Sequence, residues 1–256
     1  FAEDAPLWMR HSVISPDGTT IAFTYKGDIY TVPVAGGRAM QITTNPAYDT
    51  APVWSPDSKR IAFASDRMGS LDVYIVAKDG GEPRRLTTHS GSETPLAFTD
   101  AGHVLFSAGI MPSAEAVVFP SNGQFNQVYR VSVEGGRPTM ISSMPMECIS
   151  INKEGAMLYQ DKKGYEDYWR KHHVSPIARD IWMYTPGKEP QYRQLTTFGG
   201  EDREPVWAPD GKTFYYLSEE NGSFNIYRRT PGDAKAVQLT HYTKNPVRYL
   251  LSLIHI

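Results

Sequence analysis

A short turn signal occurs five times in the sequence, and this repeat restricts the possible folds more than any other feature. Ser15-Pro16-Asp17-Gly18 recurs as Ser55-Pro56-Asp57-Ser58 and Ala208-Pro209-Asp210-Gly211, with weaker copies at 99–102 and 152–155. Consecutive copies begin between 40 and 56 residues apart. Proline at the second position presets the backbone of a type I turn, and glycine at the fourth lets the chain leave without a side-chain clash. Each copy therefore predicts a tight turn between two strands.

The same further signals follow every turn in the same order. In the second copy they are the apolar run Ile61-Ala62-Phe63, the strand signal Asp72-Val73-Tyr74, the turn Gly80-Gly81 and a short strand ending in Leu86-Thr87. Short runs of β-branched and aromatic residues favour strands. With the run before the turn, here Pro52-Val53-Trp54, each repeat holds four strands. The repeats predict an all-β fold, a β-propeller of four-stranded blades with five blades present of an expected six.

The repeats also set the expected domain organisation. Residues 1–250 form one incomplete six-bladed propeller, and its sixth blade begins at 246. The blades cover approximately 6–43, 51–87, 95–142, 148–196 and 204–240. Residues 251–256, Leu-Ser-Leu-Ile-His-Ile, read like the translation of a sequencing adaptor, and we expect them to be an artefact. The alternative fold, a β-sandwich with coincidental turns, does not explain the constant order of the signals.

Composition excludes several classes of function. The 26 Lys and Arg residues balance 28 Asp and Glu residues and are interspersed with them, so no basic patch favours nucleic acid. No apolar stretch reaches the roughly 20 residues that cross a bilayer, and we expect no membrane span. Cys148 is the single cysteine, and we interpret it as a small core residue. The chain opens on Phe1, which favours a removed secretory signal and a periplasmic or secreted location, with the cytoplasm as the alternative.

The repeat resembles a known family. The order Ser-Pro-Asp-Gly, Ile-Ala-Phe, Asp-Ile-Tyr, Gly-Gly and Leu-Thr resembles the TolB-type propeller repeat. The run Pro6 to Arg10, followed by Ile14 to Gly18, resembles the opening of the N-terminal six-bladed propeller of bacterial tricorn-type serine peptidases. The resemblance covers residues 6 to about 250. It implies a propeller that gates substrates and acts as a scaffold in an enzyme that hydrolyses peptides.

The resemblance also implies that the catalytic domain is missing from this chain. Neither a Gly-x-Ser-x-Gly elbow nor a His-Glu-x-x-His motif occurs, so we assign no catalytic residue. The implied partners are peptide substrates, downstream domains of the same polypeptide and, as a further option, a second copy of the chain. We expect no cofactor and no metal. Two alternative functions stay open: a TolB-like periplasmic protein-binding propeller without activity, and the propeller of a prolyl-oligopeptidase-type hydrolase.

Two inserts between the second and third strands are the candidate binding loops. The third blade inserts 109–126 and the fourth inserts 162–179. Loops at the same place in adjacent blades emerge on one face, so we expect the inserts side by side as a wall or lid. The second insert contains rings and cations suited to contact with a substrate or another domain. These candidate residues are Tyr165, Trp169, Arg170, His172, His173 and Arg179. The alternative is that the insert packs against its neighbours.

Acidic residues in the connections between blades are a further set of candidates. They are Asp49, Glu93, Glu147, Asp202 and Glu204. No Asp-x-Asp-x-Asp loop gathers them, so we interpret them as turn and capping groups and not as calcium ligands.

Overall fold

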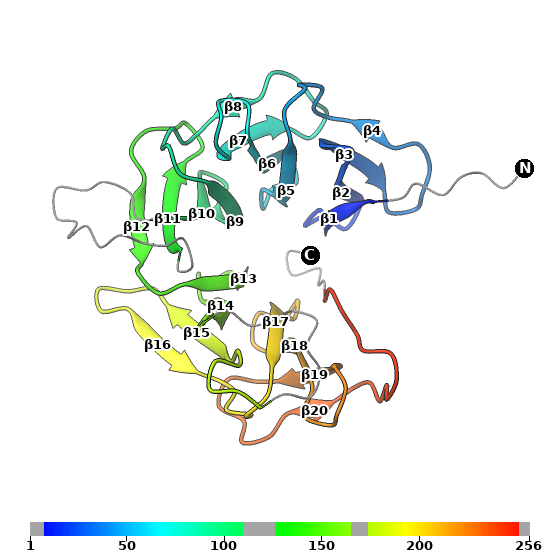
Figure 1. Ribbon diagram of the computed structural model, residues 1–256, viewed down its shortest axis with the longest axis vertical. Coiled ribbons are helices and arrows are strands. Elements are labelled where there is room, and N and C mark those ends of the chain that lie inside the picture. The colour runs from blue at the N-terminus through cyan, green and yellow to red at the C-terminus, as the bar shows by residue number, and fades with distance from the viewer. Residues whose placement is uncertain (1–7, 110–125, 165–173, 251–256) are drawn as a thin grey trace, which may run out of the picture. The chain divides into compact units, whose positions relative to one another are not determined.

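In the computed structural model the described residues are 8–109, 126–164 and 174–250. Within these ranges every regular element is a β-strand, and the strands form five four-stranded sheets, which we call blades 1 to 5 (Figure 1). In each blade the strands are hydrogen-bonded in the order in which they occur in the chain. The prediction of an all-β propeller with four-stranded blades, five of them present, is confirmed. None of the described residues belongs to a helix long and apolar enough to cross a membrane.

The chain divides into two compact units. The first unit holds blades 1 and 2 and nearly all of blade 3. Its strands are β1 (Arg10–Ile14), β2 (Thr20–Tyr25), β3 (Asp28–Pro33) and β4 (Met40–Gln41); β5 (Asp49–Trp54), β6 (Arg60–Ser65), β7 (Asp72–Ala77) and β8 (Arg84–Arg85); and β9 (Glu93–Asp100), β10 (His103–Ala108), β11 (Gln127–Ser132) and β12 (Thr139–Ser142).

The second unit holds blades 4 and 5. Its strands are β13 (Met146–Ile151), β14 (Met157–Asp161), β15 (Ile181–Thr185) and β16 (Gln191–Gln194), and β17 (Asp202–Trp207), β18 (Phe214–Ser218), β19 (Asn225–Arg229) and β20 (Val237–Gln238).

The repeated tetrapeptide forms the turn between the first two strands of a blade. Between β5 and β6, Ser58 N–H donates to the Ser55 carbonyl at 2.9 Å and closes the turn. The Ser55 hydroxyl donates to Asp57 Oδ1 at 2.5 Å and accepts from Arg60 N–H at 2.9 Å. The serine and aspartate therefore satisfy polar groups of the turn that the strand ladder leaves open. This explains why the motif recurs at the start of the hairpins.

Each core lies between two consecutive blades of one unit and follows one pattern. The second and third strands of a blade present apolar side chains to the blade that precedes it. Between blades 1 and 2 this core contains Ile61, Phe63, Tyr74 and Val76 from blade 2, with Ala22, Ile29 and Ile42 from blade 1. The same positions recur between blades 2 and 3, and between blades 4 and 5. We call the four side chains contributed by the later blade its backward face.

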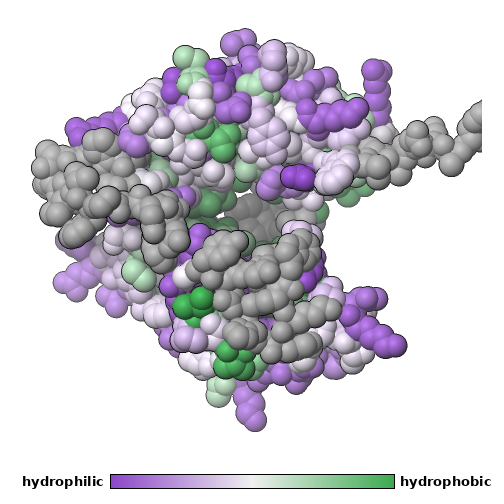
Figure 2. Space-filling model, in the orientation of Figure 1, coloured by the Kyte–Doolittle hydropathy of each residue, from purple (hydrophilic) through white to green (hydrophobic). Residues whose placement is uncertain are grey.

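Among the described residues no other blade covers the backward face of blade 1, although Phe23 itself is only 7% exposed. The members of this face, Ile21, Phe23, Tyr30 and Val32, line an apolar cavity of about 610 Å³, to which the preceding chain contributes Met9 and Ser12. The equivalent residues of blade 2 are at most 5% exposed. Elsewhere, on the face seen in Figure 2, hydrophilic side chains cover most of the surface and strongly hydrophobic residues form only small separate groups. The open cavity is therefore an unpartnered copy of an interblade surface.

The pairing of the first and second strands is irregular in all five blades, and in four of them the first strand contains a β-bulge with a residue of positive φ. His11, Ala51, Cys148 and Glu204 adopt φ values of 50° to 52°, and the strand register shifts at each. In blade 3 the matching residue is Pro95, whose ring does not permit a positive φ. A bulge re-aims the side chain it carries. The Cys148 side chain is exposed for this reason, and the prediction that it is a core residue was wrong.

Candidate functional site

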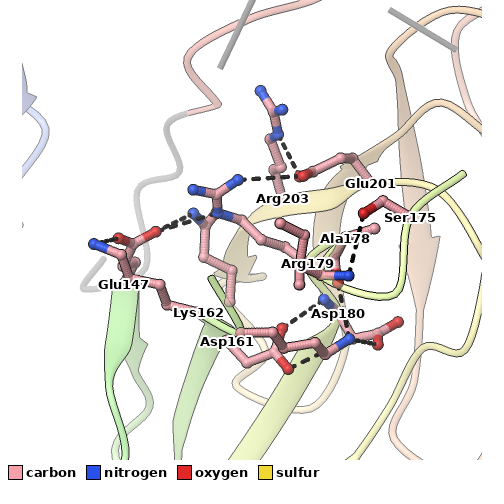
Figure 3. Close-up of polar contacts among 12 residues, drawn as sticks. Glu147, Asp161, Lys162, Ser175, Ala178, Arg179, Asp180, Glu201 and Arg203 are labelled. Atoms are coloured by element: carbon pink, nitrogen blue, oxygen red, sulfur yellow. Dashed lines mark hydrogen bonds and ion pairs between the residues drawn. The ribbon is translucent and has the colours of Figure 1, made fainter. Parts of the chain in front are cut away.

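The base of the blade 4 insert is the part of the predicted site that the structure describes. Tyr165, Trp169, Arg170, His172 and His173 lie outside the described residues, as does nearly all of the insert 109–126. Of the candidate residues the structure places Arg179, which comes just before β15. It lies in a group of charged residues from β13, the end of β14 and the start of β17 (Figure 3).

Arg179 is held by two carboxylates. Its guanidinium donates from Nε to Glu147 Oε2 at 3.3 Å and from Nη1 to Glu201 Oε1 at 3.2 Å. Arg179 is 8% exposed and Glu201 is fully buried. A buried charge needs a partner, because desolvation otherwise disfavours the ionised form. This pairing therefore attaches the end of the insert to two different strands of the second unit.

The same contacts continue in both directions as an alternating row of charges. Arg203 Nε donates to Glu201 Oε2 at 2.7 Å, and the Lys162 ammonium lies 3.3 Å from Glu147 Oε1. Each of the two glutamates thus lies between two cations, as Figure 3 shows. The Arg203 guanidinium also lies over the Phe224 ring, 4.8 Å from its centre. Lys162 and Arg179 bound the insert, so its two ends meet at one carboxylate, Glu147.

Electrostatics keep Glu147 and Arg179 ionised. Burial alone would raise the pKa of Glu147, but the hydrogen bond from Gln160 and the charges of Arg179 and Lys162 outweigh it and lower the pKa. Burial would likewise lower the pKa of Arg179, but the charges of Glu201 and Glu147 raise it. Glu147 and Arg179 therefore remain charged around neutral pH, and their attachment of the insert does not depend on pH there.

A second set of contacts reinforces the base of the insert. Lys163 Nζ donates to Asp180 Oδ2 at 2.5 Å and to the Ala178 carbonyl at 2.8 Å. Asp180 N–H donates to Asp161 Oδ1 at 2.7 Å. These bonds connect the residues before the insert with those after it. The base of the insert is therefore a rigid platform, whichever contacts its remaining residues make.

A repeated polar group, which we call the interblade junction, was missed in the sequence. Its threonine follows the fourth strand, and the threonine hydroxyl accepts a backbone N–H at the start of the third strand. Thr43 accepts from Ile29, Thr87 from Val73 and Thr196 from Ile181, at 2.9 to 3.0 Å. Two acidic residues accompany it, one from the start of the third strand and one from the first strand of the next blade. The three junctions are Asp28–Thr43–Asp49, Asp72–Thr87–Glu93 and Asp180–Thr196–Asp202.

The acidic residues between blades are therefore strand residues, and the interpretation as turn and capping groups was wrong. Asp49, Glu93 and Asp202 open β5, β9 and β17 and are at most 1% exposed. Glu147 and Glu204 also lie within first strands, β13 and β17. A signal was available, because each threonine precedes its acid by six residues in all three junctions. Within the described ranges no three His, Cys, Asp or Glu side chains converge as a metal site.

Five four-stranded blades, which pack on consecutive blades within each unit, define the class of protein as a β-propeller. The comparisons with known proteins give the family. Residues 6–253 match the model of the tricorn protease N-terminal beta propeller domain, and the chain belongs to this family.

The chain is similar to three proteins of different lengths. Tricorn protease homolog 1 of Streptomyces coelicolor is 25% identical over 224 residues, which are 87% of this chain and 20% of that protein. The crystal structure of the tricorn protease superposes with a TM-score of 0.74 at 18% identity, covering 97% of this chain and 24% of that one. A TolB structure from Agrobacterium tumefaciens gives 0.69 at 16% identity, covering 91% and 81%. The chain thus spans about a fifth of the homologous protease.

Proposed function

We propose that this chain is the N-terminal propeller of a tricorn-like serine peptidase, in which it gates peptide substrates and supports a catalytic domain encoded elsewhere in the polypeptide. The observation that carries the proposal is the family match over residues 6–253 in a chain that spans 20% of a tricorn protease homolog. The described residues themselves contain no group that we assign to catalysis. The partners in this proposal are peptide substrates and downstream domains, and the location is periplasmic or secreted, with the cytoplasm as the alternative.

The gating role rests on the insert of blade 4. Its base is attached through Arg179, Glu147 and Glu201, so the residues between 164 and 174 start and end at one defined place on the second unit. A loop with a rigid base can present side chains in a constant position, which favours selective contact. We therefore propose Tyr165, Trp169, Arg170, His172 and His173 as the residues that contact substrate or a neighbouring domain, with Arg179 attaching them.

A sixth blade that begins at residue 246 is part of the proposal. Val247 N–H donates to the Phe224 carbonyl at 2.9 Å. Asp49 makes the same bond to Gly27, Glu93 to Leu71 and Asp202 to Arg179, and each of these donors opens the first strand of a new blade. Val247 thus has the position of an opening residue. A further blade would also supply the surface that the open backward face of blade 1 lacks.

The test uses the full gene product, obtained by extending the reading frame in source DNA. We expect a serine-peptidase domain downstream and hydrolysis of peptides by the full protein, whereas residues 1–256 alone are inactive. In the full protein, Tyr165→Ala and Trp169→Ala should lower kcat/KM for long peptides severalfold more than for dipeptides. Tyr48→Ala, at an exposed tyrosine in the first unit, is the matched control. Equal losses for all lengths would contradict gating, and a frame without a peptidase domain would contradict the function.

One alternative is favoured by a specific observation. The match to TolB covers 81% of that structure, so about four fifths of that chain has structural counterparts here. A protein-binding propeller without activity would have the same blades. A stop codon after one further blade would support this alternative, and the two inserts would then be its candidate partner-binding loops.

A further inference from the structure

We propose that two interblade junctions each hold one structural proton, shared between two buried carboxyl groups, and that these protons act as pH-operated latches between blades. One latch joins blades 2 and 3 through Asp72 and Glu93. The other joins blades 4 and 5 through Asp180 and Asp202. Each lies within a single unit.

The first latch has two acids and one cation. Asp72 and Glu93 are both fully buried in the same junction, where the charge of Asp72 acts on Glu93. The Arg85 guanidinium lies 2.8 Å from Asp72 Oδ2 and is the cation of this site. If both acids were ionised, one negative charge would remain uncompensated in the interior, which is strongly unfavourable. A single proton on the pair removes that charge.

The hydrogen-bond inventory also requires a donor at this place. Among the described residues, Asp72 Oδ1 and Glu93 Oε1 are buried and accept no hydrogen bond. Two ionised carboxylates are acceptors only, so they cannot bond to each other without a proton. The Thr87 hydroxyl donates to the other oxygen of Glu93 at 3.1 Å. A proton shared by Asp72 and Glu93 is the donor that the remaining oxygens lack.

The other nearby groups do not supply that proton. His89 Nδ1 lies 3.5 Å from Glu93 Oε1, but it accepts the Gly91 N–H at 3.0 Å and so has no proton to donate as the structure stands. Arg67 is the other cation beside Tyr74 of this blade, and it bonds Asp49 at 2.7 Å. Burial, together with the charge of Asp72, raises the pKa of Glu93 to about 7.

The second latch also has two buried acids, and among the described residues Asp180 Oδ1 and Asp202 Oδ1 are buried and accept no hydrogen bond. Lys163 bonds Asp180 at 2.5 Å and also lies 3.6 Å from Asp161 Oδ2, so its one charge faces two acids before Asp202 is counted. The side chain of Asp202 is hydrogen-bonded to Ser218 and Thr196, and Glu220 adds a further negative charge nearby. Burial raises the pKa of Asp202 to about 7. At the corresponding place between blades 1 and 2, Asp28 is only half-buried and Asp49 is paired with Arg67, so one acid is accessible to water and the other has a cation of its own.

The sign of the pH effect follows from linkage. The folded chain binds each proton more tightly than the unfolded chain, in which these acids titrate near pH 4. The stabilisation is therefore complete below about pH 4, is lost progressively as the pH rises from there to about 7, and changes little above that, where the folded and the unfolded chain have both released the protons. The equilibrium constant for unfolding should rise by up to about tenfold per pH unit for each proton lost. The release leaves uncompensated negative charge between the blades and loosens them.

The test measures denaturant unfolding of the 256-residue chain between pH 5 and pH 8. Glu93→Gln and Asp202→Asn imitate the protonated acids. Each should flatten the pH dependence by about one proton, and each should make the protein more stable than wild type at pH 8. Asp49→Asn is the matched control; it breaks the pair with Arg67 and should lower stability while leaving the slope unchanged. A wild-type profile that rises or stays flat, or variants that keep the full slope, would overturn the proposal.

A second measurement covers variants that do not refold. Infrared spectra of the native wild-type chain at pH 6 should contain the carbonyl band of a protonated carboxyl group, which disappears by pH 9. The band should be weaker in either variant. Its absence from native protein at pH 6 would overturn the proposal directly. Hydrogen exchange of the Glu93 amide, which donates to the Leu71 carbonyl at 2.6 Å, should lose protection over the same pH range once intrinsic rates are subtracted.

Discussion

Single side chains in this protein pair with buried charged side chains and bond to buried backbone groups. Arg179 illustrates this, since one guanidinium joins Glu147 of β13 to Glu201 beside β17. Its residue type and its place at the end of an insert were visible in the sequence, and they indicated contact with a substrate or another domain. Its two partners were not predictable, because they lie 32 and 22 residues away and meet it only once blades 4 and 5 are packed.

Replacing Arg179 should destabilise the second unit. Arg179→Met keeps the length of the side chain but leaves Glu201 buried with one cation fewer, and we expect a loss of about 3 kcal/mol in the free energy of unfolding. Denaturant unfolding measures it. The control is Arg84→Met, which removes an exposed pair with Glu134 and should have little effect. Equal effects of the two changes would show that the Arg179 contacts do not attach the insert.

At the scale of strands and turns, the turn between two strands was predictable because it depends on neighbouring residues. The interblade junction was not predictable because it depends on residues far apart in the sequence. Proline and aspartate determine the β5–β6 turn within four residues, so the sequence alone identified it. The interblade junction joins the third strand, the residue after the fourth strand and the next blade. The pattern of Asp-Ile-Tyr and Leu-Thr was visible, but the pairing of Thr87 with Val73 and Glu93 depends on how these segments lie together.

The junction threonine should therefore be sensitive to loss of its hydroxyl. Thr87→Val keeps the shape but leaves the Val73 N–H without an acceptor, which should cost about 1–3 kcal/mol in the free energy of unfolding. Thr87→Ser keeps the hydroxyl and should cost much less. Thermal or denaturant melting of both variants tests this. If serine were as damaging as valine, the methyl group and not the hydrogen bond would be the important part.

At the scale of the whole molecule, blade 1 differs from the blades that follow another blade in its unit. Phe23 and Tyr30 have the same positions as Phe63 and Tyr74, yet among the described residues only the second pair is enclosed by another blade. The repeat predicted five blades of an expected six. The inserts are different, because their lengths and compositions differ between blades and no repeat rule specifies their conformations.

A chain extended past residue 250 by one blade should be more stable and less prone to aggregate, since the open apolar surface would be covered. A pair of substitutions tests the cause. In the 256-residue chain, Tyr74→Ala should cost about 3–5 kcal/mol and Tyr30→Ala much less. In the extended chain the two costs should converge, as measured by denaturant unfolding. A persistent difference would mean that the added blade does not reach the face of blade 1.

The bulges in the first strands allow different side chains at one backbone position of the blades. His11, Ala51, Cys148 and Glu204 have nearly the same backbone conformation but no chemistry in common. A base, a methyl group, a thiol and an acid are thus accommodated by one scaffold geometry. These bulge positions therefore tolerate side chains of different chemistry without a change in the surrounding sheet. Blade 3 is the exception, because its matching residue is Pro95.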